Sequence, residues 1–182
     1  NFVAGLILLF ERSLKVGDFV ELESGVTGEV QEIRNRSTLI TTNDNVDIVV
    51  PNSEFVSTRE TNWTMRQAHR LKRVAFSVAY GTDKELVRRA VLEAAQEVPH
   101  TLSQKTREPQ VWLVNFGESS LDFALVVWLQ PEAVKRPSRV AADYNWAIES
   151  ALGRYGIEIP FPQRDLHLRS RDDLEPKTGG AP

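Results

Sequence analysis

The hydrophobic pattern between residues 71 and 170 switches between two periods in an order that few folds accommodate. Apolar residues at every second position predict β-strands, whereas apolar residues three or four positions apart predict helices with one buried face. The pattern reads strand, helix, strand, strand, helix, strand, over residues 71–80, 86–98, 110–116, 121–129, 140–155, and 157–162 with 166–170. This is the order of a split βαβ, ferredoxin-like sandwich, in which both helices cover one face of a four-stranded sheet.

Local signals predict where these elements begin and turn. Thr82 and Glu85 have the spacing of a capping box, which places Thr82 at the N-cap of the first helix. Ser138 is the expected N-cap of the second helix, and residues 131–137 are the expected loop before it. The four residues 117–120, GESS, contain a glycine and predict a hairpin between two strands.

A different pattern occupies residues 14–64. Four short segments rich in β-branched residues are separated by turn residues, and they cover 18–22, 28–34, 37–42 and 46–51. Strands this short and this closely spaced predict a small barrel or a strongly bent sheet. Pro51 ends the last strand because proline has no N–H to donate, and Asn52 is the expected N-cap of a short helix.

The sequence contains no recognisable set of catalytic or metal-binding residues. The chain has no cysteine, and its three histidines are widely separated, so thiolate and histidine metal sites are not expected. No nucleotide-binding or hydrolase motif is present, and we expect no cofactor. Asp122 alternates with the apolar residues of its predicted strand and is expected to face solvent. These features favour a protein without catalysis.

Charge is unevenly distributed over a chain with a net charge of −3. Residues 14–64 carry four basic and nine acidic side chains, whereas residues 65–170 carry fifteen basic and twelve acidic ones. The densest basic cluster lies where the two patterns meet and comprises Arg66, Arg70, Lys72 and Arg73. Four interpretations of this cluster remain open: a solvated linker, a surface that faces anions, a contact between subunits, or a nucleic-acid binding site. The acidic first part argues against nucleic acid, because phosphate binding requires clustered bases.

The chain begins with Asn1 followed by nine apolar residues, 2–10. As a helix this run reaches about 14 Å, roughly half the thickness of a bilayer core. Arg12 and Lys15 follow it, as basic residues do at the cytoplasmic boundary of a membrane helix. A glycine such as Gly5 costs a helix about 1 kcal/mol relative to alanine, which favours close packing against a neighbour over a position that faces lipid. The missing initial methionine fits a piece of a longer protein.

Together, these segments resemble the soluble C-terminal region of the small-conductance mechanosensitive channel family. NFVAGLILLFERSLKVGDFVEL is similar to the end of the family's pore helix and the start of its β domain. GVTGEVQEIRNRSTLITTNDNVDIVVPNSEF is similar to the rest of that domain. VAYGTD, FGESSLDFALVVW and YGIEIPFPQRDLHL are similar to marker stretches of its α/β domain. The order and spacing of these stretches carry the resemblance over nearly all of residues 1–170.

The resemblance implies a channel in the inner membrane, with this portion on the cytoplasmic side. The family's subunits form a homo-oligomeric ring, a heptamer, attached to the lipid bilayer through upstream helices. Their cytoplasmic parts enclose a hollow cage, and ions cross its side portals before reaching a pore that membrane tension opens. The basic cluster Arg66, Arg70, Lys72 and Arg73 would line this vestibule or its portals.

The resemblance also implies roles for single residues. Asn1, Gly5 and Phe10 would belong to the end of the pore helix, and Asn52, at a Pro-Asn turn of the β domain, would contact Asn1. Ser53 stands where the family commonly has glycine. Leu166, His167 and Leu168 would lie in the short strand that closes the cage floor.

We therefore expect an α+β chain made of four parts. Residues 1–13 are the truncated end of a pore helix, 14–64 a small Sm-like β domain, 65–170 a ferredoxin-like α/β domain, and 171–182 a disordered tail. The expected function is the cytoplasmic vestibule of a tension-gated ion channel. The alternatives are a soluble RNA-binding protein of two domains and, third, a small hydrolase built on the ferredoxin-like sheet.

Overall fold

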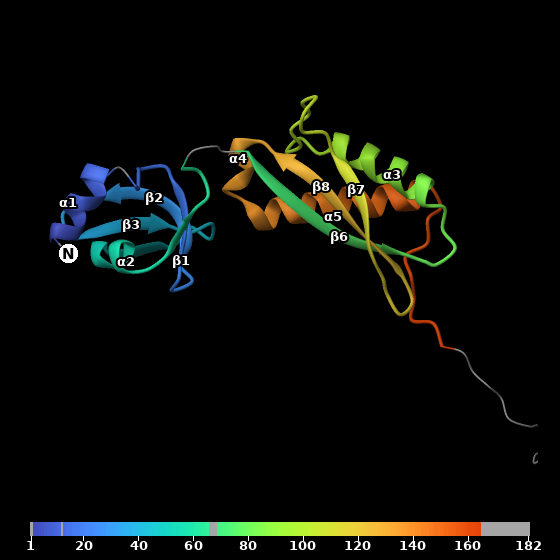
Figure 1. Cartoon of the computed structure of the whole chain (residues 1–182), viewed down its shortest axis with the longest axis horizontal. Coiled ribbons are helices and arrows are strands. Elements are labelled where there is room, and N and C mark those ends of the chain that lie inside the picture. Colours follow the sequence, from blue (N-terminus) through green and yellow to red (C-terminus); the bar gives the residue numbers. More distant parts are fainter. Residues whose placement is uncertain (1, 12, 66–68, 165–182) are drawn as a thin grey trace, which may run out of the picture.

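Two sheets in separate halves of the chain organise the structure (Figure 1). The computed structural model describes residues 2–11, 13–65 and 69–164. The helices are α1 (Phe2–Glu11), α2 (Asn52–Ser57), α3 (Lys84–Glu97), α4 (Pro131–Val134) and α5 (Pro137–Arg154). The mixture of helices and antiparallel sheets confirms the predicted α+β class.

The first sheet contains five antiparallel strands in the order β4-β3-β2-β1-β5. The four predicted segments form β1 (Phe19–Leu22), β2 (Thr27–Ile33), β3 (Ser37–Thr41) and β4 (Asp47–Pro51). β5 (Glu60–Asn62) is polar and lies outside those segments; pairing with β1 holds it in place. An irregular register between Val30 and Glu32 bends β2. The sheet encloses a small core of Leu14, Val20, Leu22, Val30, Ile40, Val50 and Phe55.

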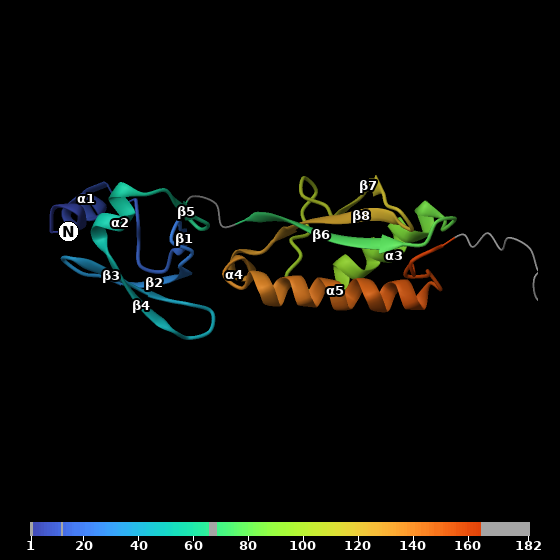
Figure 2. The ribbon, with the colours of Figure 1, turned by 90° about the horizontal axis from the view of Figure 1, so that it is seen from below.

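The second sheet has the order β6-β8-β7, with β6 (Arg70–Val78), β7 (Gln110–Phe116) and β8 (Leu121–Leu129). Both long helices, α3 and α5, lie on one side of it, as the single apolar stripes predicted (Figure 2). Central β8 is buried on both faces: Leu125 packs toward the helices, while Val126 on the other face is only 4% exposed. The predicted hairpin joins β7 to β8 through a bond from the Gly117 N–H to the Ser120 carbonyl.

The predicted fourth strand of this sheet is wrong for residues 157–162, which adopt no strand conformation. The segment does run past the outer edge of β6, where the Ala79 N–H donates to the Glu158 carbonyl (3.0 Å). Pro160 and Pro162 supply no N–H, so the ladder cannot continue beyond this bond. Residues 166–170 lie outside the described residues.

The helix starts also differ from the prediction. Asp83 rather than Thr82 is the N-cap of α3, and its carboxylate accepts the N–H of Glu85 (2.9 Å). Helix α5 begins at Pro137, one residue before the expected cap Ser138, and has no side-chain cap. Proline suits this first position because its missing N–H would have no partner there. The expected loop before it contains the short helix α4.

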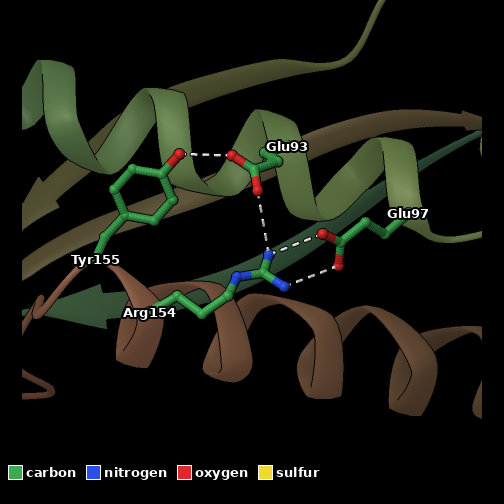
Figure 3. Close-up of polar contacts among 4 residues, drawn as sticks. All are labelled: Glu93, Glu97, Arg154 and Tyr155. Atoms are coloured by element: carbon green, nitrogen blue, oxygen red, sulfur yellow. Dashed lines mark hydrogen bonds and ion pairs between the residues drawn. The ribbon is translucent and has the colours of Figure 1, made fainter.

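Polar contacts join α3 to α5 on the side away from the sheet (Figure 3). The Arg154 guanidinium lies 2.9 Å from a carboxylate oxygen of Glu97 and 3.5 Å from one of Glu93. The Tyr155 hydroxyl donates to Glu93 at 2.5 Å, and this bond is the main cause of the raised pKa of Tyr155. The contacts are exposed, so they orient the two helices more than they stabilise them.

Glu60 is an unfavourably placed carboxylate beside β1. Its Oε2 is buried and has no hydrogen-bond partner among the described residues. Burial, and then the charge of nearby Asp18, raises the pKa of Glu60. Asp18 is itself well satisfied, because it accepts from the Lys15 N–H (3.0 Å) and the Asn62 side-chain amide (2.8 Å).

We expect Glu60→Gln to increase the free energy of unfolding at pH 7 to 8. A carboxyl group whose pKa is raised by folding favours the folded state when protonated, and this benefit is lost as the pH rises through the raised pKa. The gain of the variant should therefore shrink as the pH falls through the raised pKa and should be absent below about 4, the range of an unperturbed Glu. Urea denaturation across this pH range measures it. The exposed Glu23→Gln serves as control, and an equal effect of both variants at pH 7 would contradict the interpretation.

Candidate functional site

Helix α1 lies against the β domain through its small residues. Ala4 and Gly5 are buried, whereas Phe2, Val3 and Leu6 point outward and are 61%, 66% and 47% exposed. Figure 1 shows α1 beside α2, at the end of the β domain remote from the second sheet. Over residues 2–6, the helix therefore presents its small residues to its own chain and its large apolar side chains to the surroundings.

The contact at Gly5 leaves no space for a side chain. A Cβ at this position would lie 2.6 Å from the Asn35 carbonyl oxygen and 2.7 Å from the Asn52 side-chain nitrogen. Carbon atoms do not approach oxygen and nitrogen so closely, so the helix can reach this position only with glycine. This close approach offsets the cost of a glycine inside a helix.

Asn52 lies directly under α1 and is fully buried. Its side-chain oxygen accepts from the Thr38 hydroxyl, and its side-chain nitrogen donates to the Arg34 carbonyl, both at 2.8 Å. Its backbone N–H donates to the Arg36 carbonyl (3.0 Å). Asn52 thus connects α2, β3 and the turn between β2 and β3.

The predicted role of Asn52 as a helix N-cap is wrong. The N-cap position is Pro51, which has no side-chain hydrogen bond, and Asn52 is the first residue of α2. Its amide bonds to the neighbouring strand and turn instead of to its own helix. The Asn52 side chain therefore forms contacts with distant parts of the chain instead of capping α2, and the local sequence does not reveal those contacts.

The remaining helix-end and cage-floor residues are only partly described. Asn1, Arg12 and Arg66 lie outside the described residues, as do Leu166, His167 and Leu168. Phe10 is within α1, but its side chain is not described. Lys15 is exposed just after α1, at the entry to the β domain.

The described members of the basic cluster do not share one surface. In β6, Arg70 and Lys72 lie opposite Leu129 and Val127 of β8, on the face that the helices cover. Arg73 lies on the other face, because successive side chains of a strand alternate. The Arg70 guanidinium lies 3.2 Å from the centre of the Trp63 ring, and burial lowers its pKa. Residues adjacent in sequence therefore have separate roles.

Trp63 forms the junction between the two sheets, a role that the sequence did not indicate. Its ring meets Phe19 of β1 edge to face at 6.0 Å and Arg70 of β6 face on. It also packs against the core of the second sheet. An isolated tryptophan near a predicted boundary is the only signal that could have identified it.

A second junction lies beside a cleft of about 960 Å³ between the two halves. Lys135, after α4, forms an ion pair with Glu29 of β2 at 3.2 Å. The cleft is lined by polar residues of the hairpin between β3 and β4, including Asn43, and by Arg136 and Arg139 at the start of α5. This second junction is thus polar, whereas the junction at Trp63 is aromatic.

Asn52→Ala should lower the free energy of unfolding by about 1–3 kcal/mol. The substitution leaves the Thr38 hydroxyl and the Arg34 carbonyl without their buried partner. Urea denaturation of the variant measures the loss. The exposed Asn43→Ala is the matched control and should change stability by less than about 0.5 kcal/mol. Equal effects of the two variants would show that the buried network contributes nothing.

Reversing either charge of the Lys135–Glu29 pair should broaden the distribution of distances between the two halves. Like charges at about 3 Å repel, whereas the native pair, whose side chains are 26% and 36% exposed, contributes about 1 kcal/mol or less. The double variant Glu29→Lys, Lys135→Glu should restore the distribution. Spin labels on one introduced cysteine in each half measure it, since the chain has no native cysteine. An unchanged distribution in both single variants would contradict the assignment.

Two family descriptions match most of the chain. Residues 1–65 match the β domain of mechanosensitive ion channels. Residues 73–159 match the C-terminal domain of the mechanosensitive ion channel MscS. Among the described residues, no helix has both the length and the apolar character needed to cross a bilayer.

Individual relatives agree with these matches. The mechanosensitive channel MscK of Escherichia coli is 36% identical over 170 residues, which are 93% of this chain and 15% of the relative. An MscS family protein of Archaeoglobus fulgidus is 33% identical over 90% of this chain and 56% of the relative. This chain thus spans only part of the length of the curated relatives that it matches.

A solved structure also has this arrangement. The closed-state crystal structure of Helicobacter pylori MscS superposes with a TM-score of 0.79 at 26% identity, over 93% of this chain and 65% of that one. The predicted resemblance is confirmed at the levels of sequence and fold. The chain belongs to the MscS family of mechanosensitive ion channels.

Proposed function

We propose that this chain is the cytoplasmic vestibule of a membrane-tension-gated ion channel and carries out no catalysis. Its relatives include proteins named as mechanosensitive channels. In this proposal α1 continues a pore helix of the inner membrane, and residues 14–64 and 65–170 are the two domains on the cytoplasmic side. Subunits assemble into a homo-oligomeric ring, a heptamer, and ions pass through portals in its wall.

The contact of Gly5 with Asn35 and Asn52 is the observation that carries this proposal. A helix held at van der Waals distance from the backbone of a rigid domain cannot move without moving that domain or breaking the contact. The outward side chains Phe2, Val3 and Leu6 suit lipid or a neighbouring helix rather than water. The β domain then acts as a support for the end of the pore helix.

Tension would act on this support through an equilibrium between closed and open states. Membrane tension favours the state with the larger area in the membrane plane, and only contacts that differ between the states change the balance. If the pore helix moves on opening, the contact at Gly5 differs between the closed and open states and therefore affects their balance. The cleft beside Lys135 and Glu29 suits the passage of hydrated ions because polar and charged side chains of both signs line it.

RNA binding is less well supported. Arg73 lies on the opposite face of β6 from Arg70 and Lys72, and Arg70 is engaged with Trp63. Phosphate groups are bound by clustered, accessible bases.

The direct test of the channel proposal is a patch-clamp recording from membranes that contain the full-length protein. Suction should open a conductance that is absent from membranes without the protein, and silence under suction would refute the channel function.

Gly5→Ala should change the tension at half-opening while the chain still folds. The added Cβ would displace α1 from Asn35 and Asn52, and a loss of about 1.4 kcal/mol in one state changes the ratio of open to closed channels about tenfold. Patch-clamp recordings at graded suction measure this shift. Gly153→Ala in α5 is the matched control, since its Cβ meets no atom within 4 Å, and it should leave the threshold unchanged. The same threshold in Gly5→Ala as in the wild type would remove the coupling role.

A further inference from the structure

The cleft of about 960 Å³ between the two halves has a wall from each of them. The hairpin between β3 and β4 supplies one wall, and α4 with the start of α5 supplies the other (Figure 2). Cavities of roughly 300–1,000 Å³ at domain interfaces are common places for small molecules to bind. The cleft therefore has the size and the position of a small-molecule site.

Two arginines make the α5 wall basic. Arg136 and Arg139 stand three positions apart at the start of α5, a spacing that places side chains on one side of a helix, and both line the cleft. Within the described residues neither guanidinium forms an ion pair, whereas Lys135 is already paired with Glu29. A guanidinium presents a planar set of N–H donors that matches the oxygens of a phosphate group. This wall is thus equipped to hold a phosphate.

The acidic residues near the cleft do not cancel this charge. Glu29 is held by Lys135, and Asp143 is bonded to His100 at 2.9 Å and does not line the cleft. Glu132 lines the cleft but is exposed and unpaired within the part of the chain that the structure describes. The lining carries three cations and two carboxylates, so an anion finds a net positive charge there.

The hairpin wall offers uncharged hydrogen-bonding groups. The side-chain amides of Asn43 and Asn45 line the cleft and make no hydrogen bond among the described residues. The Thr42 hydroxyl accepts from the Val46 N–H (3.2 Å) and keeps its own hydrogen free to donate. Asp44 lies between the two asparagines but does not line the cleft. This wall therefore suits the hydroxyl groups of a ligand rather than its phosphate.

The described lining contains no Phe, Tyr or Trp, so a nucleobase would have no such ring to stack on. We propose that the cleft binds a small polyhydroxylated phosphate ester, a sugar phosphate by class. Arg136 and Arg139 hold its phosphate, and Asn43 and Asn45 bond to its hydroxyl groups. Because the two pairs belong to different halves of the chain, the bound molecule ties the halves together. This inference goes beyond the proposed channel function and does not depend on it.

Isothermal titration calorimetry of the full-length protein with glucose 6-phosphate, at constant ionic strength, tests the site. We expect saturable binding, and at least about tenfold weaker binding of glucose or inorganic phosphate, because each of these reaches only one wall. Arg136→Gln and Arg139→Gln should each weaken the binding of glucose 6-phosphate by about tenfold, since each removes charge-assisted hydrogen bonds. Arg59→Gln, at an exposed arginine outside the cleft, is the matched control and should bind as the wild type does.

Spin labels on one introduced cysteine in each half give a second measurement. Glucose 6-phosphate should narrow the distribution of distances between the halves in the wild type and in Arg59→Gln, but not in Arg136→Gln. Absence of saturable binding, or equal binding by the wild type and both cleft variants, would overturn the site. Inorganic phosphate that binds as tightly as glucose 6-phosphate, or an unchanged distance distribution, would overturn the bridging ligand, because the hairpin wall would then contribute nothing. None of these results depends on whether the protein conducts ions.

Discussion

The buried side-chain amide of Asn52 is the interaction on which the arrangement of the β domain and α1 depends. Its two hydrogen bonds join β3 and the turn before it to the start of α2, and the same nitrogen forms part of the surface that Gly5 contacts. An amide that is fully buried and bonded at both its oxygen and its nitrogen has one acceptable orientation, since rotation would place like groups together. The position of α1 is therefore fixed by a rigid polar group, and a change at this point is transmitted to the strands below.

The two halves of the chain have separate cores and meet at two junctions. Each sheet has its own hydrophobic core, and the junction consists of Trp63 with its neighbours and the ion pair of Lys135 with Glu29. A partly exposed ion pair contributes little to stability, whereas each core is held by the burial of many apolar side chains. Motion at the junction is therefore expected to cost less than deformation of either core.

Hydrophobic periodicity predicted most of the fold, because strands and amphipathic helices are set by which face is buried. It identified four of the five strands of the first sheet, both long helices and the β7–β8 hairpin. It missed β5, a polar strand held by pairing with β1, and it predicted a fourth strand where two prolines prevent one. In the site, the close packing of Gly5 followed from the cost of glycine in a helix. The roles of Asn52 and Trp63 did not, because their partners lie far away in the sequence.

The placement of exposed apolar residues distinguishes two kinds of surroundings. Phe2, Val3 and Leu6 of α1 lie at one end of the molecule, and strand β7, whose Trp112, Val114 and Phe116 are also exposed, lies in the second domain, beyond the whole β domain (Figures 1 and 2). A bilayer that receives α1 at one end cannot also cover β7, since the β domain separates the two. In the proposed channel, the exposed apolar residues of α1 therefore suit lipid or neighbouring helices, whereas those of β7 lie too far away to share that contact. In the proposed channel, α1 would meet lipid or neighbouring helices, whereas the second domain would lie outside the bilayer.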